Sequence, residues 1–125
     1  MFIGSNRSFA AVKSSNLISP YMDYIAYASC DLYINSSGVA TVKASVNGYQ
    51  GITTKATINV KLQKYVNGSW TTCKTYSTSS DTYRTSLSET YNLSKGYSYR
   101  VEATIKAYQD TLSETQTITS SEAYY

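Results

Sequence analysis

Apolar and polar residues alternate along most of the chain from Tyr24 onwards. Residues 97–108 are the clearest example, because every second residue from Tyr99 is apolar or aromatic and the residues between them are polar or charged. A period of two places successive side chains on opposite faces of a strand that is buried on one side. The inward-facing residues that this alternation predicts are Ala26, Ala28, Cys30, Leu32, Ile34, Ala40, Val42, Ala44, Val46, Ile58, Val60, Leu62, Leu87, Tyr91, Leu93, Tyr99, Val101, Ala103, Ile105 and Ala107.

Turn signals divide the alternating segments into seven predicted strands. The strongest signal is Asn67-Gly68, because both central residues of a type I′ hairpin turn need a positive φ. This hairpin is expected to place Tyr65 opposite Trp70. Seven short strands joined by short turns indicate an all-β fold, a seven-stranded antiparallel β-sandwich. The predicted strands cover about residues 24–34, 39–46, 55–66, 69–76, 82–93, 97–108 and 113–123.

Residues 1–22 show no sustained period, so we expect a flexible N-terminal leader there and a β-sandwich domain over residues 23–125. The leader lacks the run of about 7 to 15 apolar residues of a secretory signal. Strands rich in Ser, Thr, Asn and Tyr with few charges nevertheless favour an extracellular protein, secreted or at the cell surface. Three explanations of the missing signal stay open: a signal that was removed, a start inside a signal, or a cytosolic protein.

One corner of the chain resembles the fibronectin type III domain. In residues 93–103, Leu93 precedes a turn containing Gly96, and Tyr99 then begins a series of alternating small apolar residues. The resemblance implies an immunoglobulin-like (fibronectin type III-like) sandwich in which the Tyr99 hydroxyl bonds to the backbone near the corner. The alternative is that Tyr99 is only an inward-facing core residue.

A longer resemblance covers most of residues 28–108. Residues 32–46, 61–72 and 93–101 are similar to a family of small secreted proteins of unknown function from Gram-positive bacteria. That resemblance implies a fold and export from the cell, but no activity.

The residues that most enzymes depend on are missing or scattered. The chain has no histidine, which excludes Ser-His-Asp and Cys-His nucleophiles and most transition-metal sites. Two cysteines are too few for a closed zinc site, and the eight carboxylates form no cluster along the sequence. We therefore expect no catalysis, no cofactor and no metal, although two carboxylates from different strands are an arrangement that the sequence leaves open.

The net charge of +3 is modest and its lysines are spread among apolar and hydroxyl residues. Lys55, Lys61, Lys64 and Lys74 form the nearest approach to a cluster, which is far from the footprint of a nucleic-acid-binding protein. A solvated strand face explains these lysines, and a weak attraction to anionic cell-wall polymers is the alternative. We expect no nucleic acid, no membrane insertion and a monomer or weak oligomer.

The predicted Asn67-Gly68 hairpin presents the one surface that resembles a binding site. Aromatic rings beside amide, hydroxyl and cationic groups stack on sugars or hold an extended peptide. If the sixth predicted strand pairs with the third, Arg100, Glu102, Thr104 and Lys106 extend this surface. The alternative is that Tyr65 and Trp70 simply cover each other. The predicted ligand-binding residues are Lys61, Gln63, Tyr65, Trp70, Lys74 and Tyr76.

These observations predict a non-catalytic secreted interaction or structural module whose partner is an unknown protein or glycan at a cell surface. The alternative function is a carbohydrate-binding protein with an aromatic platform around Trp70. A ring face that is open to solvent would favour the sugar platform, and a ring stacked beneath its neighbours would favour the structural role.

The two cysteines are predicted to face inward, with Cys73 opposite Leu62 on the hairpin. In a fibronectin-type arrangement Cys30 and Cys73 lie at opposite lateral edges of different sheets. A disulfide needs Cα atoms within about 7 Å, and the sheets alone lie about 10 Å apart. The sequence therefore predicts two free, buried thiols and no disulfide.

Overall fold

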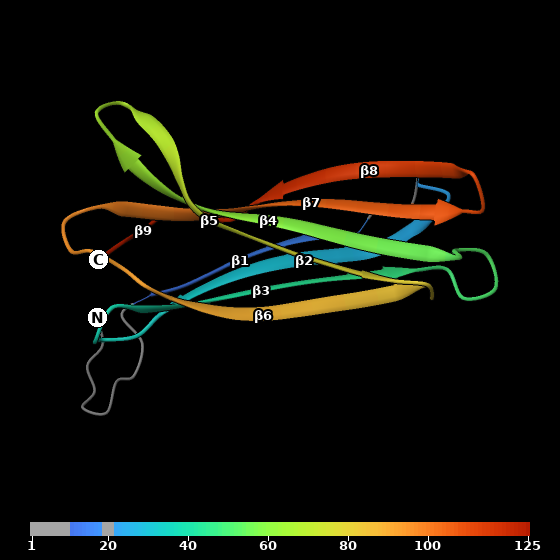
Figure 1. The fold of residues 1–125 in the computed structure, drawn as a ribbon, viewed down its shortest axis with the longest axis horizontal. Helices are drawn as coiled ribbons and strands as arrows, with labels where there is room; N and C mark the ends of the chain where they lie inside the picture. The colour runs from blue at the N-terminus through green and yellow to red at the C-terminus, as the bar shows by residue number, and fades with distance from the viewer. Residues whose placement is uncertain (1–10, 19–21) are drawn as a thin grey trace.

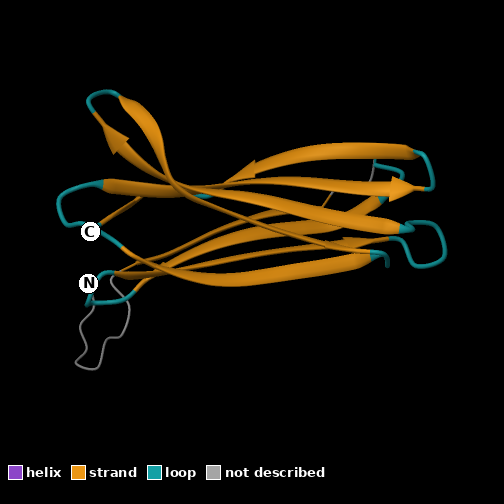
Figure 2. Ribbon diagram, viewed as in Figure 1, coloured by secondary structure: helices purple, strands orange, loops and turns teal. Residues whose placement is uncertain are grey.

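The structure of the protein, a computed structural model, describes residues 11–18 and 22–125. These residues form nine strands and no helix (Figure 2). Residues 1–10 and 19–21 of the predicted leader lie outside the described part. The strands are β1 (Ala11–Ile18), β2 (Ile25–Ile34), β3 (Val39–Gly48), β4 (Lys55–Val66), β5 (Ser69–Ser80), β6 (Arg84–Asn92), β7 (Ser98–Gln109), β8 (Leu112–Thr119) and β9 (Ala123–Tyr124).

Two antiparallel sheets face each other (Figure 1). One sheet has the strand order β1-β2-β3-β6, and the other has the order β5-β4-β7-β8 with β9 also paired to β7. The predicted all-β, two-sheet antiparallel architecture is confirmed. Strands β2 to β8 occupy the seven stretches in which the alternation predicts strands. Strand β7 pairs with β4, which meets the condition under which the sixth predicted strand extends the surface of the third.

Strand β1 lies inside the stretch that was predicted to be a flexible leader. It pairs with the edge of β2 over its whole length, from Ala11 opposite Ile34 to Ile18 opposite Tyr27. The sequence did not predict it, because a strand added at an edge obtains its backbone hydrogen bonds from its neighbour and needs little alternation of its own.

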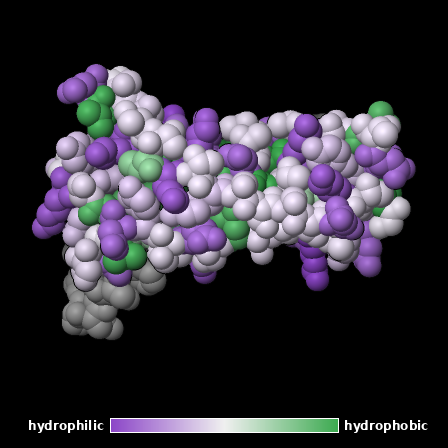
Figure 3. All heavy atoms as spheres, in the orientation of Figure 1, coloured by the Kyte–Doolittle hydropathy of each residue, from purple (hydrophilic) through white to green (hydrophobic). Residues whose placement is uncertain are grey.

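The core fills the space between the sheets with the predicted alternate residues of β3, β4 and β7. Strand β2 differs at its start, where the register shifts between Ile25 and Tyr27. The extra residue is Ala26, so Ile25 is buried in the core and Ala26 is only half-buried, contrary to the prediction for Ala26. Leu87, Tyr91 and Leu93 pack against the core while staying partly exposed. The face of the molecule seen in Figure 3 is mostly polar.

The β4–β5 hairpin has the predicted turn, with φ of 50° at Asn67 and 84° at Gly68. Tyr65 lies opposite Trp70, as predicted. Further from the turn the register shifts, so that Leu62 lies opposite Lys74 and not Cys73. Cys73 is the extra residue of this bulge. Every later residue of β5 therefore points to the face opposite to the one that uninterrupted alternation predicts.

The predicted hydrogen bond of Tyr99 is present. This residue is 1% exposed, and its hydroxyl donates to the Ser94 carbonyl at 2.6 Å and accepts from the Ser94 amide at 3.1 Å. The corner turns at Gly96, where φ is 94°. Burial raises the pKa of the Tyr99 hydroxyl, which therefore stays a donor in the folded protein.

Both cysteines are free thiols. Cys30 is buried, and its sulfur lies 3.7 Å from the Ile118 carbonyl oxygen as a weak donor. Cys73 is only half-buried, contrary to the prediction, because the bulge places it beside the core at the edge strand.

A carboxylate that the sequence did not single out holds the start of β2. Glu114 on β8 accepts hydrogen bonds from the backbone amides of Asp23, Tyr24 and Ile25, at 2.6, 2.7 and 3.2 Å. The first inward residue of β2 is thereby tied to the other sheet.

Candidate functional site

The outward face of β4 and β7 carries most of the charge on the β5-β4-β7-β8 sheet. Because the two strands pair directly, their outward residues form two parallel rows. We call the outward surface around Lys55, Lys61, Arg100 and Lys106 the cationic face. Glu102 is the single carboxylate at the outward positions of the described strands of this sheet. The paired residues are Lys55 with Tyr108, Thr57 with Lys106, Asn59 with Thr104, Lys61 with Glu102, and Gln63 with Arg100.

One end of the cationic face is a cluster around Trp70. The Arg100 guanidinium carbon lies 4.3 Å from the centre of the Trp70 ring, and the Tyr65 ring lies 5.1 Å from it at 59°. The Arg100 Nε donates to the Gln63 side-chain oxygen at 2.8 Å, and Gln63 is 8% exposed. The structure thus brings together Tyr65, Trp70 and Gln63, as predicted. The cluster also contains Arg100, which the sequence placed only as an extension.

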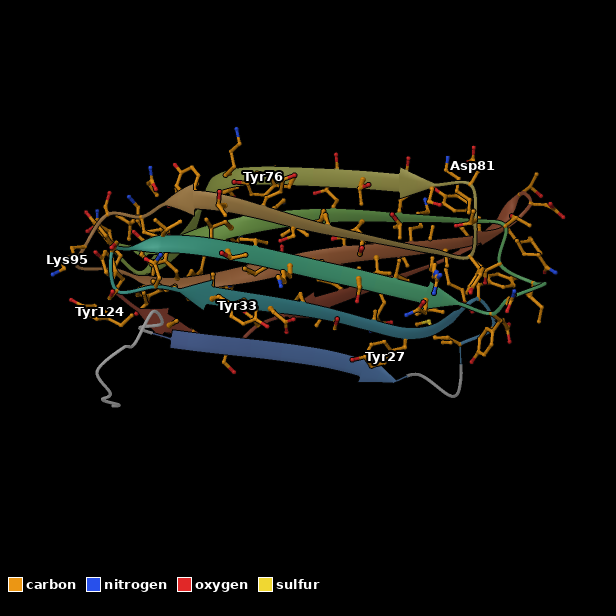
Figure 4. All side chains as sticks on the ribbon, turned by 90° about the horizontal axis from the view of Figure 1, so that it is seen from below. Tyr27, Tyr33, Tyr76, Asp81, Lys95 and Tyr124 are labelled. Carbon is orange, nitrogen blue, oxygen red and sulfur yellow. The ribbon has the colours of Figure 1, made fainter. Side chains whose placement is uncertain are left out.

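Lys61 lies on the same face, at the outward position of β4 that precedes Gln63. Lys74 and Tyr76 do not. The bulge at Cys73 places them opposite Leu62 and Val60, on the side of β5 that faces the other sheet, so the prediction that they share the outward face with Trp70 is wrong. The Tyr76 hydroxyl donates to the Thr90 carbonyl of β6 at 3.1 Å, at the margin where β5 lies beside β6 (Figure 4).

The other end of the cationic face is a second cluster, around Tyr108. The ammonium groups of Lys55 and Lys106 each lie 5.3 Å from the centre of the Tyr108 ring. Lys106 is six residues beyond Arg100 on β7. At about 3.3 Å per residue, the two clusters lie about 20 Å apart along the strand.

Aromatic rings are the usual partners of cations in this protein. Residues 22–125 contain nine lysines and arginines, and seven of them lie over a Tyr or Trp ring at 4.3 to 5.7 Å from the ring centre. Such pairs occur about once per 70 to 80 residues in an ordinary protein. The many tyrosines therefore hold the cations of the surface in place. Lys61 and Lys74 are the two exceptions.

Each sheet has an open depression on its outer side. On the β5-β4-β7-β8 sheet it has a volume of about 390 Å³ and is lined by Thr57, Asn59, Ser77 and Ser79 among others. On the other sheet a depression of about 390 Å³ is lined mainly by serines, and two of these, Ser29 and Ser45, share a hydrogen bond of 2.9 Å. Tyr27 and Tyr33 lie on β2 beside it (Figure 4). Both depressions are lined by groups that hydrogen-bond, and both are open to solvent.

Within the described residues, no three His, Cys, Asp or Glu side chains come together in a way that could hold a metal ion. The described part of the chain also has no helix long and apolar enough to cross a membrane. No protein-family model matches the chain, and no curated protein and no solved structure matches it either.

Proposed function

We propose that this protein is a non-catalytic interaction module that binds its partner with the outer side of the β5-β4-β7-β8 sheet. The observation that carries the proposal is the cluster of Trp70, Tyr65 and Arg100. A few residues dominate the binding energy at protein interfaces, and these residues are enriched in Trp, Tyr and Arg. Here they stand on paired strands, which fix their positions better than loops do. The hairpin that bears Trp70 also extends beyond the rest of its sheet (Figure 1).

The scaffold of the proposed module is an immunoglobulin-like sandwich of the fibronectin type III kind. Its seven strands are β2 to β8, arranged as β2-β3-β6 and β5-β4-β7-β8, and β1 and β9 are additions. The bond between Tyr99 and Ser94 supports this assignment, because such a tyrosine bonds to the backbone a few residues upstream in that class of domain. Relationship to the small secreted proteins of Gram-positive bacteria, and an extracellular location, are part of the same proposal.

The aromatic sugar platform is less well supported than the interaction module. A sugar that stacks on an indole needs a clear ring face, but the Trp70 ring already carries the Arg100 guanidinium and lies beside Tyr65. Arg100 is also held by Gln63, so moving it away leaves a buried amide oxygen unpaired.

A comparison of two aromatic variants tests the proposed function. Trp70→Ala removes the centre of the cluster, and Tyr124→Ala removes an aromatic side chain that is 68% exposed on β9. Immobilised protein is incubated with bacterial and host surface extracts and with a glycan array. We expect the parent and Tyr124→Ala to retain the same partner and a folded Trp70→Ala to lose it.

Titration of the parent protein with the retained partner provides a spectroscopic readout, since Trp70 is the single tryptophan of the chain. Its emission should shift when the partner is added. If the three proteins retain the partner equally, or if the parent retains nothing, the proposal is refuted.

A further inference from the structure

We infer that the cationic face binds an extended polysaccharide that carries carboxylate groups. The inference rests on the proposed function and names the class of its partner. Lys55, Lys61, Arg100 and Lys106 would contact the carboxylates, and the hydroxyl and amide side chains between them would contact the sugar hydroxyls.

Charge complementarity is the first reason. Four cations and one carboxylate, Glu102, give the cationic face a net charge of +3, which equals the net charge of the whole chain. On the outer side of the β1-β2-β3-β6 sheet, the described side chains include two cations, Lys43 and Arg84, and one carboxylate, Asp31. The positive potential of the molecule is thus concentrated on one face, where it attracts an anionic partner.

The second reason is that three of the four cations, all except Lys61, are held in position before a ligand arrives. Arg100 lies over Trp70 and donates a hydrogen bond from its Nε to the Gln63 side-chain oxygen. The guanidinium makes no other hydrogen bond within the described residues. Its two terminal nitrogens are left as a planar fork, the geometry that binds a carboxylate with two parallel hydrogen bonds. Lys55 and Lys106 are held in the same way over Tyr108. Groups that are already ordered lose less entropy on binding.

The third reason is the shape and composition of the region between the clusters. The clusters lie about 20 Å apart along the paired strands β4 and β7, which suits a linear polymer better than a single small anion. Thr57, Asn59 and Thr104 lie between them, and Thr57 and Asn59 also line the depression on this sheet. A single-stranded nucleic acid fits less well, because its bases need open ring faces and the rings of Trp70 and Tyr108 are covered by cations.

The inference is tested with two variants of equal charge. Lys55→Gln/Lys61→Gln/Lys106→Gln removes three cations from the cationic face, and Lys43→Gln/Lys74→Gln/Lys95→Gln removes three from elsewhere. Each variant lowers the formal net charge from +3 to 0, because 3 − 3 = 0. The probes are alginate as the carboxylated polysaccharide, dextran as a neutral one, heparin as a sulfated one and oligothymidylate as a nucleic acid. Binding is measured by calorimetry with the full chain at two salt concentrations.

We expect alginate to bind the parent, to bind the first variant about tenfold more weakly or worse, and to bind the second variant within about twofold of the parent. Added salt should weaken the binding. Equal losses in both variants would show attraction to net charge alone and would overturn the inference. Binding of dextran as strongly as alginate, or a preference for heparin or oligothymidylate, would overturn it too.

Failure of the inference is distinguishable from failure of the proposed function. If the first variant still retains the partner from the surface extracts while Trp70→Ala loses it, the partner is not an anionic polysaccharide but the module still binds through its hairpin. If the parent retains no partner and binds no probe, both proposals fail together.

Discussion

The interior and the cationic face use the same kinds of side chain to different effect. In the interior, Tyr99 is buried and its hydroxyl both donates to and accepts from Ser94. On the cationic face, Trp70 is half-buried and its ring carries Arg100, whose charge is only partly removed from water. An unpaired polar group costs about 1 to 3 kcal/mol when it is buried and little when water replaces its partner. Aromatic residues therefore stabilise the fold in the interior, whereas on the cationic face they mainly fix the positions of cations.

Alkaline pH should have the largest effect, and it should act on the interior. Burial, and secondarily the charge of Asp31, raise the pKa of the Cys30 thiol from 9.0 to about 12. The folded state therefore keeps this proton at pH values where the unfolded state has lost it. The resulting stabilisation is fully present below pH 9 and is lost as the pH rises through about 12. At about 1.4 kcal/mol per pKa unit, the loss reaches about 4 kcal/mol.

The measurement is urea unfolding at a series of pH values between about 8 and 11, for the parent and for Cys30→Ala. The variant lacks the titrating group, so its free energy of unfolding should fall less steeply with pH. Parallel curves for the two proteins would show that the Cys30 thiol does not contribute.

The second prediction removes one hydroxyl from the interior. Tyr99→Phe leaves both the amide and the carbonyl of Ser94 without their partner. The free energy of unfolding should fall by about 1 to 3 kcal/mol. Chemical denaturation provides the measurement, and Tyr124→Phe, at an exposed position, is the control. An unchanged denaturation midpoint for Tyr99→Phe would mean that this corner does not stabilise the fold.

The third prediction concerns the free energy of unfolding when a side chain of the cationic face is changed. Arg100→Gln removes the cation from Trp70 and the hydrogen bond to Gln63. We expect a loss of about 1 to 2 kcal/mol in unfolding free energy, because the exposed cation–ring pair contributes about 0.5 to 1 kcal/mol and the buried Gln63 oxygen also loses its partner. Lys43→Gln, which removes the cation over Tyr33 on the other sheet, is the matched control and should cost about 0.5 kcal/mol or less. A loss above 3 kcal/mol for Arg100→Gln would show that this face is part of the stabilising core.

The fourth prediction concerns the two thiols and involves no change in stability. Burial raises the pKa of both, but Cys73 is half-buried at a bulge near Lys64, which partly opposes the increase. Iodoacetamide should modify Cys73 in the folded protein and Cys30 only after denaturation, because the reactive species is an accessible thiolate. The intact mass, measured without reductant, should show one added alkyl group for the folded protein and two for the denatured protein. No added group after denaturation would reveal a disulfide.

Much of the fold was predictable because a period of two is a local property. The inward sets of β3, β4 and β7 needed nothing beyond the alternation, and Asn67-Gly68 identified its hairpin through the need for positive φ. The Tyr99 corner was found through a resemblance and has the expected hydrogen bond.

The candidate surface was predictable only for the residue pairs of the hairpin between the turn and the bulge. Tyr65, Trp70 and Gln63 were placed correctly because they precede the bulge, whereas Lys74 and Tyr76 were misplaced because they follow it. One extra residue in a strand reverses every later side chain, and no residue near Cys73 marks that insertion.

The sequence by itself determined where β2 to β8 lie, which side of β3, β4 and β7 is apolar, where the turns between these strands fall, and that the excess charge is positive. Only the tertiary structure decided which distant strands become neighbours, since the pairing of β7 with β4 joins residues that are 35 (Lys64 and Tyr99) to 53 (Lys55 and Tyr108) positions apart along the chain. That pairing places Arg100 on Trp70 and Lys55 beside Tyr108, and it gathers scattered charges into one face. The reason is physical: alternation depends on each strand alone, whereas a surface depends on the register between strands, which packing and bulges set.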